Sequence, residues 1–174
     1  MNDFVLVKPS VEYAQEICAY RQEMLDHNSP FDGCGGLGDL DDIEAWITQC
    51  RLCEKEETKP KPEWVVASQF MLVQKGDDRI LGMINLRHYL NDFLAEYGGH
   101  IGYSVRPTER RRGYAKVMLA LCLEECRKLG LERVLLTCYP DNKGSYKTIE
   151  ACGGQFERIT QKDGTKYSRY WTAL

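Results

Sequence analysis

One segment in the middle of the chain restricts the possible folds more than any other, because a strand, a polar loop, a helix and a second strand follow one another without a break. The first strand pattern covers Gly99–Val105 and is ended by Arg106-Pro107, since proline has no amide to donate to a sheet. Apolar residues then recur at helical spacing over Arg112–Leu129, and Gly130 is a suitable C-terminal cap. Arg133–Cys138 follows as a short buried strand. This order predicts a mixed α/β sheet with a strand–helix–strand unit near its middle.

Further strands and helices are expected on both sides of this unit. Apolar and β-branched runs predict strands, and apolar residues three or four apart predict helices. Ser10 is a suitable N-cap for the first helix, and Asp39 or Asp41 for the second. The added strands cover residues 4–7, 64–73, 80–86, 155–160 and 166–172, and the added helices cover about 11–25, 43–50 and 142–152. A chain of 174 residues, 43% of them apolar, suits one domain spanning 1–174.

Composition and charge exclude several classes of protein. With 43% apolar residues and no repeat, the chain is neither disordered nor collagen-like nor a coiled coil. Its longest apolar runs, such as Phe70–Val73, are far shorter than the ~20 residues of a membrane span. Met1–Phe4 lacks the basic and then apolar start of a signal peptide. We therefore expect a soluble cytoplasmic protein with no membrane partner, and a net charge of -3 argues against nucleic-acid binding.

The eight cysteines do not form a metal-binding pattern. Cys50-x-x-Cys53 is a single pair, whereas a structural zinc site needs four ligands, and the sequence has no second Cys-x-x-Cys or His-x-x-x-His. No metal is therefore expected. Cys122 and Cys126, one helical turn apart, are expected to pack in reduced form as small hydrophobic residues.

The loop before the central helix carries the strongest functional signal, Arg110-Arg111-Arg112-Gly113-Tyr114-Ala115. Backbone amides at a helix start have no partner within the helix, and together with the helix dipole they favour an anion such as a pyrophosphate. Gly113 lets phosphate oxygens approach the backbone, and the arginines add positive charge. A solvated basic cluster is the alternative. However, three cations at a helix N-terminus oppose the dipole unless an anion offsets them.

These residues resemble a known signature. Arg110-x-x-Gly113-x-Ala115 is similar to the Arg/Gln-x-x-Gly-x-Gly/Ala motif of the GCN5-related N-acetyltransferase (GNAT) superfamily. Ile101–Pro107 resembles the central strand of that family, Asn142-x-x-Ser145 its asparagine motif, and Gly153–Phe156 its glycine–aromatic break. The element order matches over nearly the whole chain, and the motifs lie within about 99–156. The resemblance implies an α/β fold with a mixed, mostly antiparallel sheet of about seven strands, flanked by about four helices.

The resemblance also implies acetyl-CoA as co-substrate. Its pyrophosphate is expected on backbone amides of the motif, which are those of Arg110, Arg111, Arg112, Gly113, Tyr114 and Ala115. Val105 is expected to pair its backbone with the pantetheine arm like an added strand. Asn142 and Ser145 are expected to contact the pantetheine arm or the cofactor end. Asn142 is equally well explained as a helix N-cap, and one residue can do both.

In this family the acceptor amine attacks the thioester directly, which requires a base for the amine and a proton donor for the departing thiolate. Relatives often carry a tyrosine seven residues after the asparagine, where this chain has Ile149. Tyr146 and Tyr139 are the candidates to replace it, although either can be a packing aromatic. His100 is the candidate base, because its ordinary pKa lies near 6.5. The alternative for His100 is a strand histidine with an ordinary hydrogen bond.

An excess of acidic side chains over residues 32–57 is the one indication about the acceptor. An acidic wall there would attract a cationic amine, whereas a solvated helix face is the commoner meaning of such a run. We therefore expect acetyl transfer to a primary amine of a small molecule or peptide. The rival function is a CoA-binding regulatory domain that has lost catalysis, which the isoleucine at position 149 suggests. A homodimer is also considered, formed through the last strands.

Overall fold

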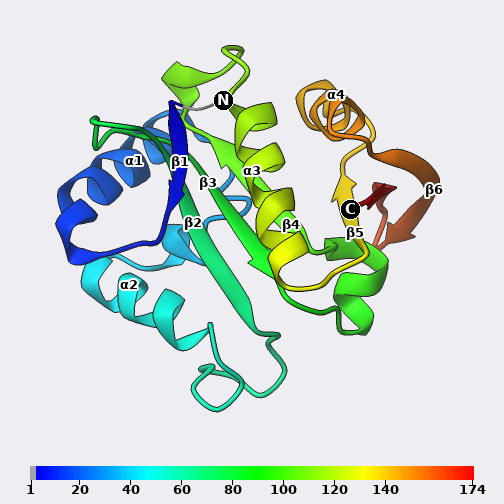
Figure 1. Cartoon of the computed structure of the whole chain (residues 1–174), viewed down its shortest axis with the longest axis horizontal. Helices are drawn as coiled ribbons and strands as arrows, with labels where there is room; N and C mark the ends of the chain where they lie inside the picture. Colours follow the sequence, from blue (N-terminus) through cyan, green and yellow to red (C-terminus); the bar gives the residue numbers. More distant parts are fainter. Residues whose placement is uncertain (1–2) are drawn as a thin grey trace.

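The computed structural model describes residues 3–174; Met1 and Asn2, part of the segment inspected for a signal peptide, lie outside the described residues. The strands are β1 Phe4–Val7, β2 Ala67–Gln74, β3 Ile80–Arg87, β4 Ile101–Val105, β5 Arg133–Cys138, β6 Gln155–Lys162 and β7 Thr165–Ala173. They form one sheet in the order β1-β2-β3-β4-β5-β7-β6 (Figure 1). All neighbours are antiparallel except β4 and β5. The expected mostly antiparallel seven-stranded sheet is confirmed.

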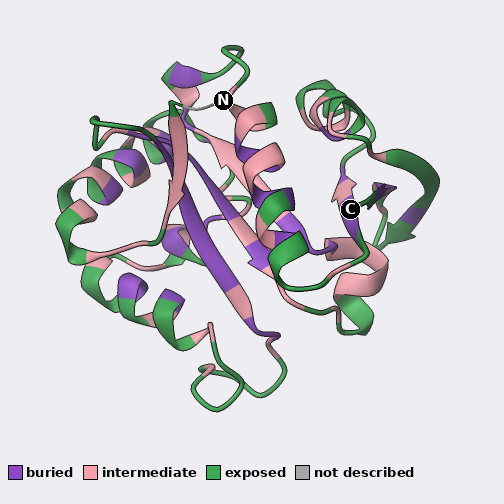
Figure 2. Cartoon of the chain, viewed as in Figure 1, coloured by how far each residue is buried: buried purple, intermediate pink, exposed green. Residues whose placement is uncertain are grey.

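Four α-helices of the described chain cover the two faces of this sheet. They are α1 Ala14–Asp26, α2 Ile43–Leu52, α3 Tyr114–Lys128 and α4 Lys143–Ala151. Successive side chains of β2 point to opposite faces, so Phe70 and Leu72 join the core layer of α3 and α4. Met71 and Val73 join the layer of α1 and α2. Most of β2 is therefore buried on both faces, as Figure 2 shows, which explains its unbroken apolar sequence.

The N-terminus of α2 differs from the expected one. Its cap is Asp42, whose Oδ1 accepts the amide of Ala45 at 3.0 Å. Neither Asp39 nor Asp41 has this role, and Asp41 instead accepts from the guanidinium of Arg21 at 2.7 Å. Three acidic residues stand close together here, and the spacing alone does not distinguish which of them begins the helix.

Other boundaries shift by a few residues. Ser10 precedes a short 3-10 turn ahead of α1 and makes no capping bond with its side chain. β2 begins at Ala67 instead of residue 64, while Gly130 follows α3 at a φ of 76°, as expected for a C-terminal glycine. A π-helical turn at Leu94–Gly98 was not expected, and it connects β3 to β4.

The junction of β4 and β5 is the irregular point of the sheet. Only one residue pair, Ile101 with Leu136, joins these parallel strands, so their facing edges beyond this pair have no partner. Just before it, the N–H of His100 donates to Leu135 O at 2.7 Å, and His100 Nδ1 accepts from the Leu135 N–H at 2.9 Å. Gly99 has a φ of 66°, and a Cβ there would lie 2.6 Å from Leu135 O, so glycine is required. The side chain of His100 thus closes one end of the split.

The state of His100 gives a prediction about stability. The residue is 6% exposed, and burial, followed by the charge of Arg87, lowers its pKa from 6.5 to about 4. Between these values the unfolded chain binds a proton that the folded chain does not. We therefore expect the free energy of unfolding to decrease as the pH falls from 6.5 towards about 4, by at most about 3 kcal/mol.

Urea unfolding of the wild type and of His100→Asn across this pH range checks the prediction. Asparagine keeps a hydrogen-bond acceptor near the position of Nδ1 but does not titrate. The variant should be less stable at neutral pH and should lose less stability on acidification. Equal losses in the two proteins would show that His100 is not the group responsible.

Candidate active site

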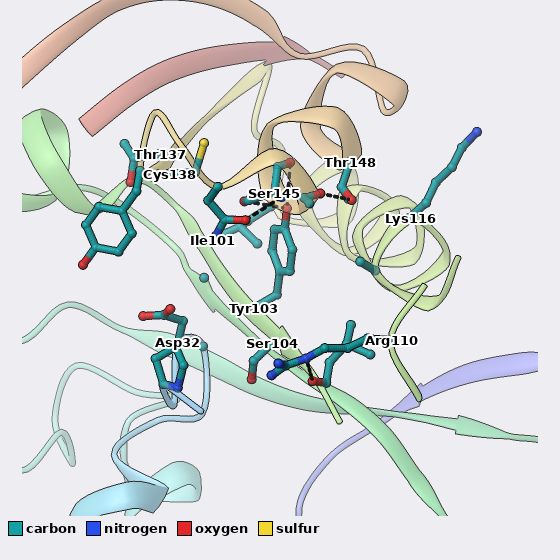
Figure 3. Close-up of a pocket in the computed structure, with 18 of the residues that line it drawn as sticks. Asp32, Ile101, Tyr103, Ser104, Arg110, Lys116, Thr137, Cys138, Ser145 and Thr148 are labelled. Atoms are coloured by element: carbon teal, nitrogen blue, oxygen red, sulfur yellow. Dashed lines mark hydrogen bonds between the residues drawn. The ribbon is translucent and has the colours of Figure 1, made fainter. Parts of the chain in front are cut away.

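A pocket of about 740 Å³ opens between the unpaired edges of β4 and β5. It is walled by the loop between α1 and α2, by the start of α3, and by the start of α4 with the residues just after β5 (Figure 3). Its lining includes Asp32, Tyr103, Gly113, Tyr139 and Ser145. The split in the sheet therefore holds residues from several distant parts of the sequence.

The start of α3 forms an anion-binding end of this pocket. Among the described residues, no hydrogen-bond acceptor is found for the amides of the five residues from Arg111 to Ala115. Arg111 and Gly113 both have left-handed backbone, with φ of 63° and 86°. Such unpaired amides beside a helix N-terminus suit phosphate oxygens, so these residues fit the diphosphate of a coenzyme A ester.

The side chains of the arginine cluster are less free than their backbone. Arg110 Nε donates to Val105 O at 3.1 Å, and Arg112 forms an ion pair with Glu109 at 3.0 Å. Arg111 makes no ion pair with any residue of the described chain and lines the pocket. The backbone, with Arg111, is therefore the main source of positive potential at this end.

On the opposite wall, the start of α4 meets a side chain from β4. The phenol oxygen of Tyr103 lies 3.0 Å from Ser145 Oγ (Figure 3). Burial raises the pKa of Tyr103 to about 12, although the hydrogen bond with Ser145 acts in the other direction, so the phenol keeps its proton. Asn142 is the N-cap of α4, because its Oδ1 accepts the amide of Ser145 at 3.0 Å, and it also lines the pocket.

The loop between α1 and α2 brings Asp32 to the pocket, a residue that the sequence analysis does not single out. The next residue, Gly33, has a φ of 69°, and a Cβ there would lie 2.1 Å from Gly102 O of β4. Glycine therefore allows the loop to touch the strand. Gln69 Nε2 donates to Gly33 O at 2.8 Å and fixes the loop from β2.

The carboxylate of Asp32 has no hydrogen bond or ion pair within residues 3–174, and Figure 3 shows it pointing into the pocket. Burial raises its pKa, and the charge of Arg87 opposes this effect. A carboxylate in this state can accept a proton more readily than an ordinary surface aspartate. The signal in the sequence is an acidic residue at the start of a glycine-rich turn.

The three expected catalytic side chains have different positions. Tyr139 lines the pocket, with its ring centroid 5.6 Å from that of Tyr167. Tyr146 packs at the edge of the core beside α3 and does not line the pocket. His100 is buried, its Nδ1 accepts a hydrogen bond from a backbone amide, and it does not line the pocket either. We therefore assign neither His100 nor Tyr146 to catalysis.

The acidic run over 32–57 does not form a continuous wall. Asp42 caps α2, Asp41 pairs with Arg21, and Glu54 pairs with Lys8 at 2.6 Å. Within this run only Asp32 lines the pocket described above. Most of these charges serve local contacts, which is the commoner explanation of such a run.

Comparison with known proteins assigns the family. A family model described as an acetyltransferase (GNAT) domain matches residues 4–155. The chain belongs to this family of acetyltransferases, and the resemblance seen in the sequence is confirmed. Acetyl-CoA is the co-substrate, and the amides at the start of α3 fit its diphosphate.

Individual relatives are distant. An uncharacterized N-acetyltransferase, YnaD of Bacillus subtilis, is 26% identical over 106 residues, an alignment that covers 60% of this chain and 60% of that protein. The aligned part is thus less than two thirds of that relative.

Solved structures of low identity share the fold. The microcin self-immunity acetyltransferase MccE, in complex with acetyl-CoA and AMP, has a TM-score of 0.71 at 18% identity, covering 100% of this chain and 94% of its own. Mycobacterium smegmatis RimJ, in complex with a CoA disulfide, has a TM-score of 0.71 at 18% identity, covering 98% and 82%. The ribosomal α-N-protein acetyltransferase RimL, with coenzyme A, has a TM-score of 0.71 at 11% identity, covering 100% and 96%.

No helix within residues 3–174 is both long and apolar enough to cross a membrane. No three His, Cys, Asp or Glu side chains there are grouped so that they could hold a metal ion. All eight cysteines are free thiols, and five of them, among them Cys122 and Cys126, are buried.

The anion end of the pocket can be tested with Gly113→Asp. The change places a carboxylate, on strained left-handed backbone, where a diphosphate is expected. We expect the Kd for coenzyme A to rise at least about tenfold, because charge-assisted hydrogen bonds are worth ~1.5–3 kcal/mol. Isothermal titration calorimetry measures it.

The matched control is Gly130→Asp at the other end of α3, where the φ of 76° imposes a similar strain and no atom lies within 4 Å. This variant should bind coenzyme A like the wild type. If both variants lose affinity equally, or neither does, the diphosphate does not bind at the start of α3.

Proposed function

We propose that this protein transfers the acetyl group of acetyl-CoA to a primary amine by direct attack of the amine on the thioester. One observation carries the proposal: Asp32 and the Tyr103–Ser145 pair face the same pocket from different walls, next to the anion end. A group that can take a proton and a group that can give one are thus available in one pocket. The acetyl group arrives as a thioester, and an N–C bond forms as the C–S bond breaks.

The co-substrate is held mainly by backbone in this proposal. Amides from Arg111 to Ala115 bind the diphosphate, and the unpaired edge of β4 up to Val105 pairs with the pantetheine arm. Asn142 and Ser145 line the same passage from α4. The Arg110 guanidinium already donates to Val105 O, so that carbonyl keeps one lone pair for the arm.

Asp32 takes the proton of the incoming ammonium group. Its carboxylate is free of partners in the described chain, and its raised pKa makes it a stronger base than an ordinary aspartate. The ring of Tyr139 stands nearby in the same pocket, and its pKa is raised by burial, then by Tyr167 and Asp32. These aromatic faces can also attract the cationic form of the amine before it loses its proton.

Ser145 gives a proton to the departing sulfur, and Tyr103 supports it. The Ser145 hydroxyl is a weak acid on its own, but Tyr103, protonated at neutral pH, can replace the proton through the 3.0 Å contact. The two oxygens occupy the wall of α4, where the family tyrosine is absent. Because the proton moves along one short hydrogen bond, the donor need not come from position 149.

The rival function, a CoA-binding regulatory domain without catalysis, predicts a different outcome in one assay. Acetyl-CoA is incubated with polyamines, amino acids, aminoglycosides and peptides with free N-termini, and released thiol is measured. Tight binding of acetyl-CoA without thiol release on any amine would favour the rival. The carboxylate of Asp32, which lines the pocket and has no partner within residues 3–174, favours the enzyme, because catalysis needs a group that can take a proton and a regulatory pocket does not.

Two properties of the whole protein belong to the same proposal. The free state of all eight thiols agrees with a reducing compartment such as the cytoplasm. A homodimer through β6 is supported by its position at the edge of the sheet and by Phe156 and Ile159, which are 55% and 50% exposed. Light scattering should then give twice the mass of one chain.

Asp32→Asn tests the base. We expect kcat to fall by ~10²–10⁴-fold, the usual contribution of a general base, while the Kd for coenzyme A is unchanged. The wild-type kcat/KM should fall on acidification through the pKa of Asp32, which lies above its ordinary value of 3.8, and the variant should lack this limb.

Asp78→Asn is the control, since Asp78 is an exposed residue between β2 and β3 and carries the same charge. It should keep both kcat and the acid limb. An Asp32→Asn protein with normal turnover would refute the assignment of Asp32 while leaving acetyl transfer itself intact.

A further inference from the structure

Arg87, the last residue of β3, stands between two pockets. It lines the pocket between β4 and β5, and it also lines a second pocket of about 540 Å³. The second pocket lies between α2, β2, β3 and the segment before β2, and it is lined by Trp64 and by several carboxamides. Arg87 and Phe93 line both pockets, so a molecule that reaches from one pocket into the other can contact Arg87 on the way.

Only half of the Arg87 guanidinium is used by the protein. Nη1 donates to Gly98 O at 3.1 Å and to Gly99 O at 3.2 Å, which fixes the side chain against the turn before β4. Nε and Nη2 have no acceptor within residues 3–174, and Nη2 lies 3.4 Å from the position that a Cβ would take on Gly102. The Nε–Nη2 edge, which can hold a carboxylate by two parallel hydrogen bonds, is thus left open.

Arg87 is half-buried, and two fully buried arginines show how this fold treats such a charge. Arg106 is 4% exposed and bonds to Glu16 and Glu23. Arg169 is 5% exposed and bonds to Glu157 at 2.7 Å. Arg87 has no carboxylate of the described chain within 4 Å, although burial lowers its pKa. Because a half-buried cation without a counterion is costly, its open edge points to an anion supplied by a ligand.

We propose that Arg87 binds the carboxylate of the acceptor, and that the acceptor is a free α-amino acid whose amine faces Asp32. The inference rests on the proposed acetyl transfer and names its substrate class. In this arrangement the amine is acetylated in the first pocket, the carboxylate pairs with the Nε–Nη2 edge, and the side chain extends into the second pocket.

The distribution of charge in the first pocket supports an acceptor that carries both a positive and a negative charge. Asp32 and Arg87 both line the first pocket, are not in direct contact, and yet each shifts the pKa of the other. A compact molecule with an ammonium and a carboxylate on one carbon neutralises both groups at once. A simple amine would leave Arg87 unpaired, and a peptide N-terminus has an amide where the carboxylate would be.

The second pocket offers mixed contacts for a side chain. Gln69 and Asn85 are bonded to each other there, with Asn85 Nδ2 donating to Gln69 Oε1 at 3.1 Å. Gln49 Nε2 donates to Gly35 O at 3.1 Å, which fixes that carboxamide as well. Amide groups held in this way, next to the indole of Trp64, give a rigid wall of polar and apolar surface.

The experiment compares each of several L-amino acids with the amine that remains when its carboxylate is removed, such as phenylalanine with phenethylamine, leucine with isoamylamine and lysine with cadaverine. We expect kcat/KM to be at least about tenfold higher for one or more amino acids than for the matched amines, as for the loss of one charge-assisted contact. Arg87→Gln should bring this ratio towards one.

Arg51→Gln removes the same charge from an exposed site on α2 and should leave the ratio unchanged. A folding defect in Arg87→Gln would lower both rates together, and the wild-type ratio then decides alone. Equal use of amino acids and matched amines by the wild type, or efficient use of peptide N-termini, would overturn the amino-acid proposal but keep the transferase. Absence of thiol release with every acceptor would instead overturn the proposed function.

Discussion

The fold depends on how β4 is held at its two ends. At its start, the N–H of His100 donates to Leu135 O, and His100 Nδ1 accepts from the Leu135 N–H. These bonds lie beside the one residue pair that joins β4 to β5. Past its end, Arg106 forms ion pairs with Glu16 and Glu23 of α1, which link the end of β4 to the layer of α1 and α2. Between these two anchors the edge of β4 toward β5 stays open. The pocket lies along that open edge, with the anion end, Asp32 and the Tyr103–Ser145 pair in its walls.

Carboxylates neutralise two buried arginines of the fold, Arg106 and Arg169. Burial alone would raise the pKa of Glu23, but the hydrogen bonds from Arg106 and Thr108 lower this pKa to about 2. The Glu23 carboxylate therefore stays ionised and paired. Arg169 joins Glu157 and Glu96, the latter at 3.6 Å, which fixes the turn before β4 against β7. The charges left without a partner in the described chain include Asp32, Arg87 and Arg111, and all three line the pocket.

Local sequence patterns were sufficient to predict those features of the fold and the site that local interactions determine. The strand–helix–strand unit, the unpaired amides after Arg110 and the cap role of Asn142 each follow from residues close together in the chain, and the structure shows these elements. The sequence patterns do not identify Asp32 and Arg87 as site residues, because only the packing of distant segments brings these two side chains to the pocket. Asp32 reaches the site only because Gly33 touches Gly102 from 69 positions away, a contact that no periodicity reveals. The position of His100, which is buried outside the pocket, depends on packing in the same way, because Leu135 of β5 bonds to its side chain.

The isoleucine at position 149 now has a structural explanation that does not require loss of catalysis. Its side chain is fully buried, and Gly154 approaches it so closely that a Cβ there would lie 2.3 Å from Ile149 Cγ2. The position faces the core between α4 and α3, so a polar side chain there would lose packing and reach no open edge of β4. In the proposed mechanism, a side chain can donate the proton if it lies close to the split in the sheet, whichever helix or strand it belongs to. Ser145 meets that requirement together with Tyr103, because the strand that forms the split holds the Tyr103 hydroxyl 3.0 Å from Ser145 Oγ, and neither oxygen depends on the residue at position 149.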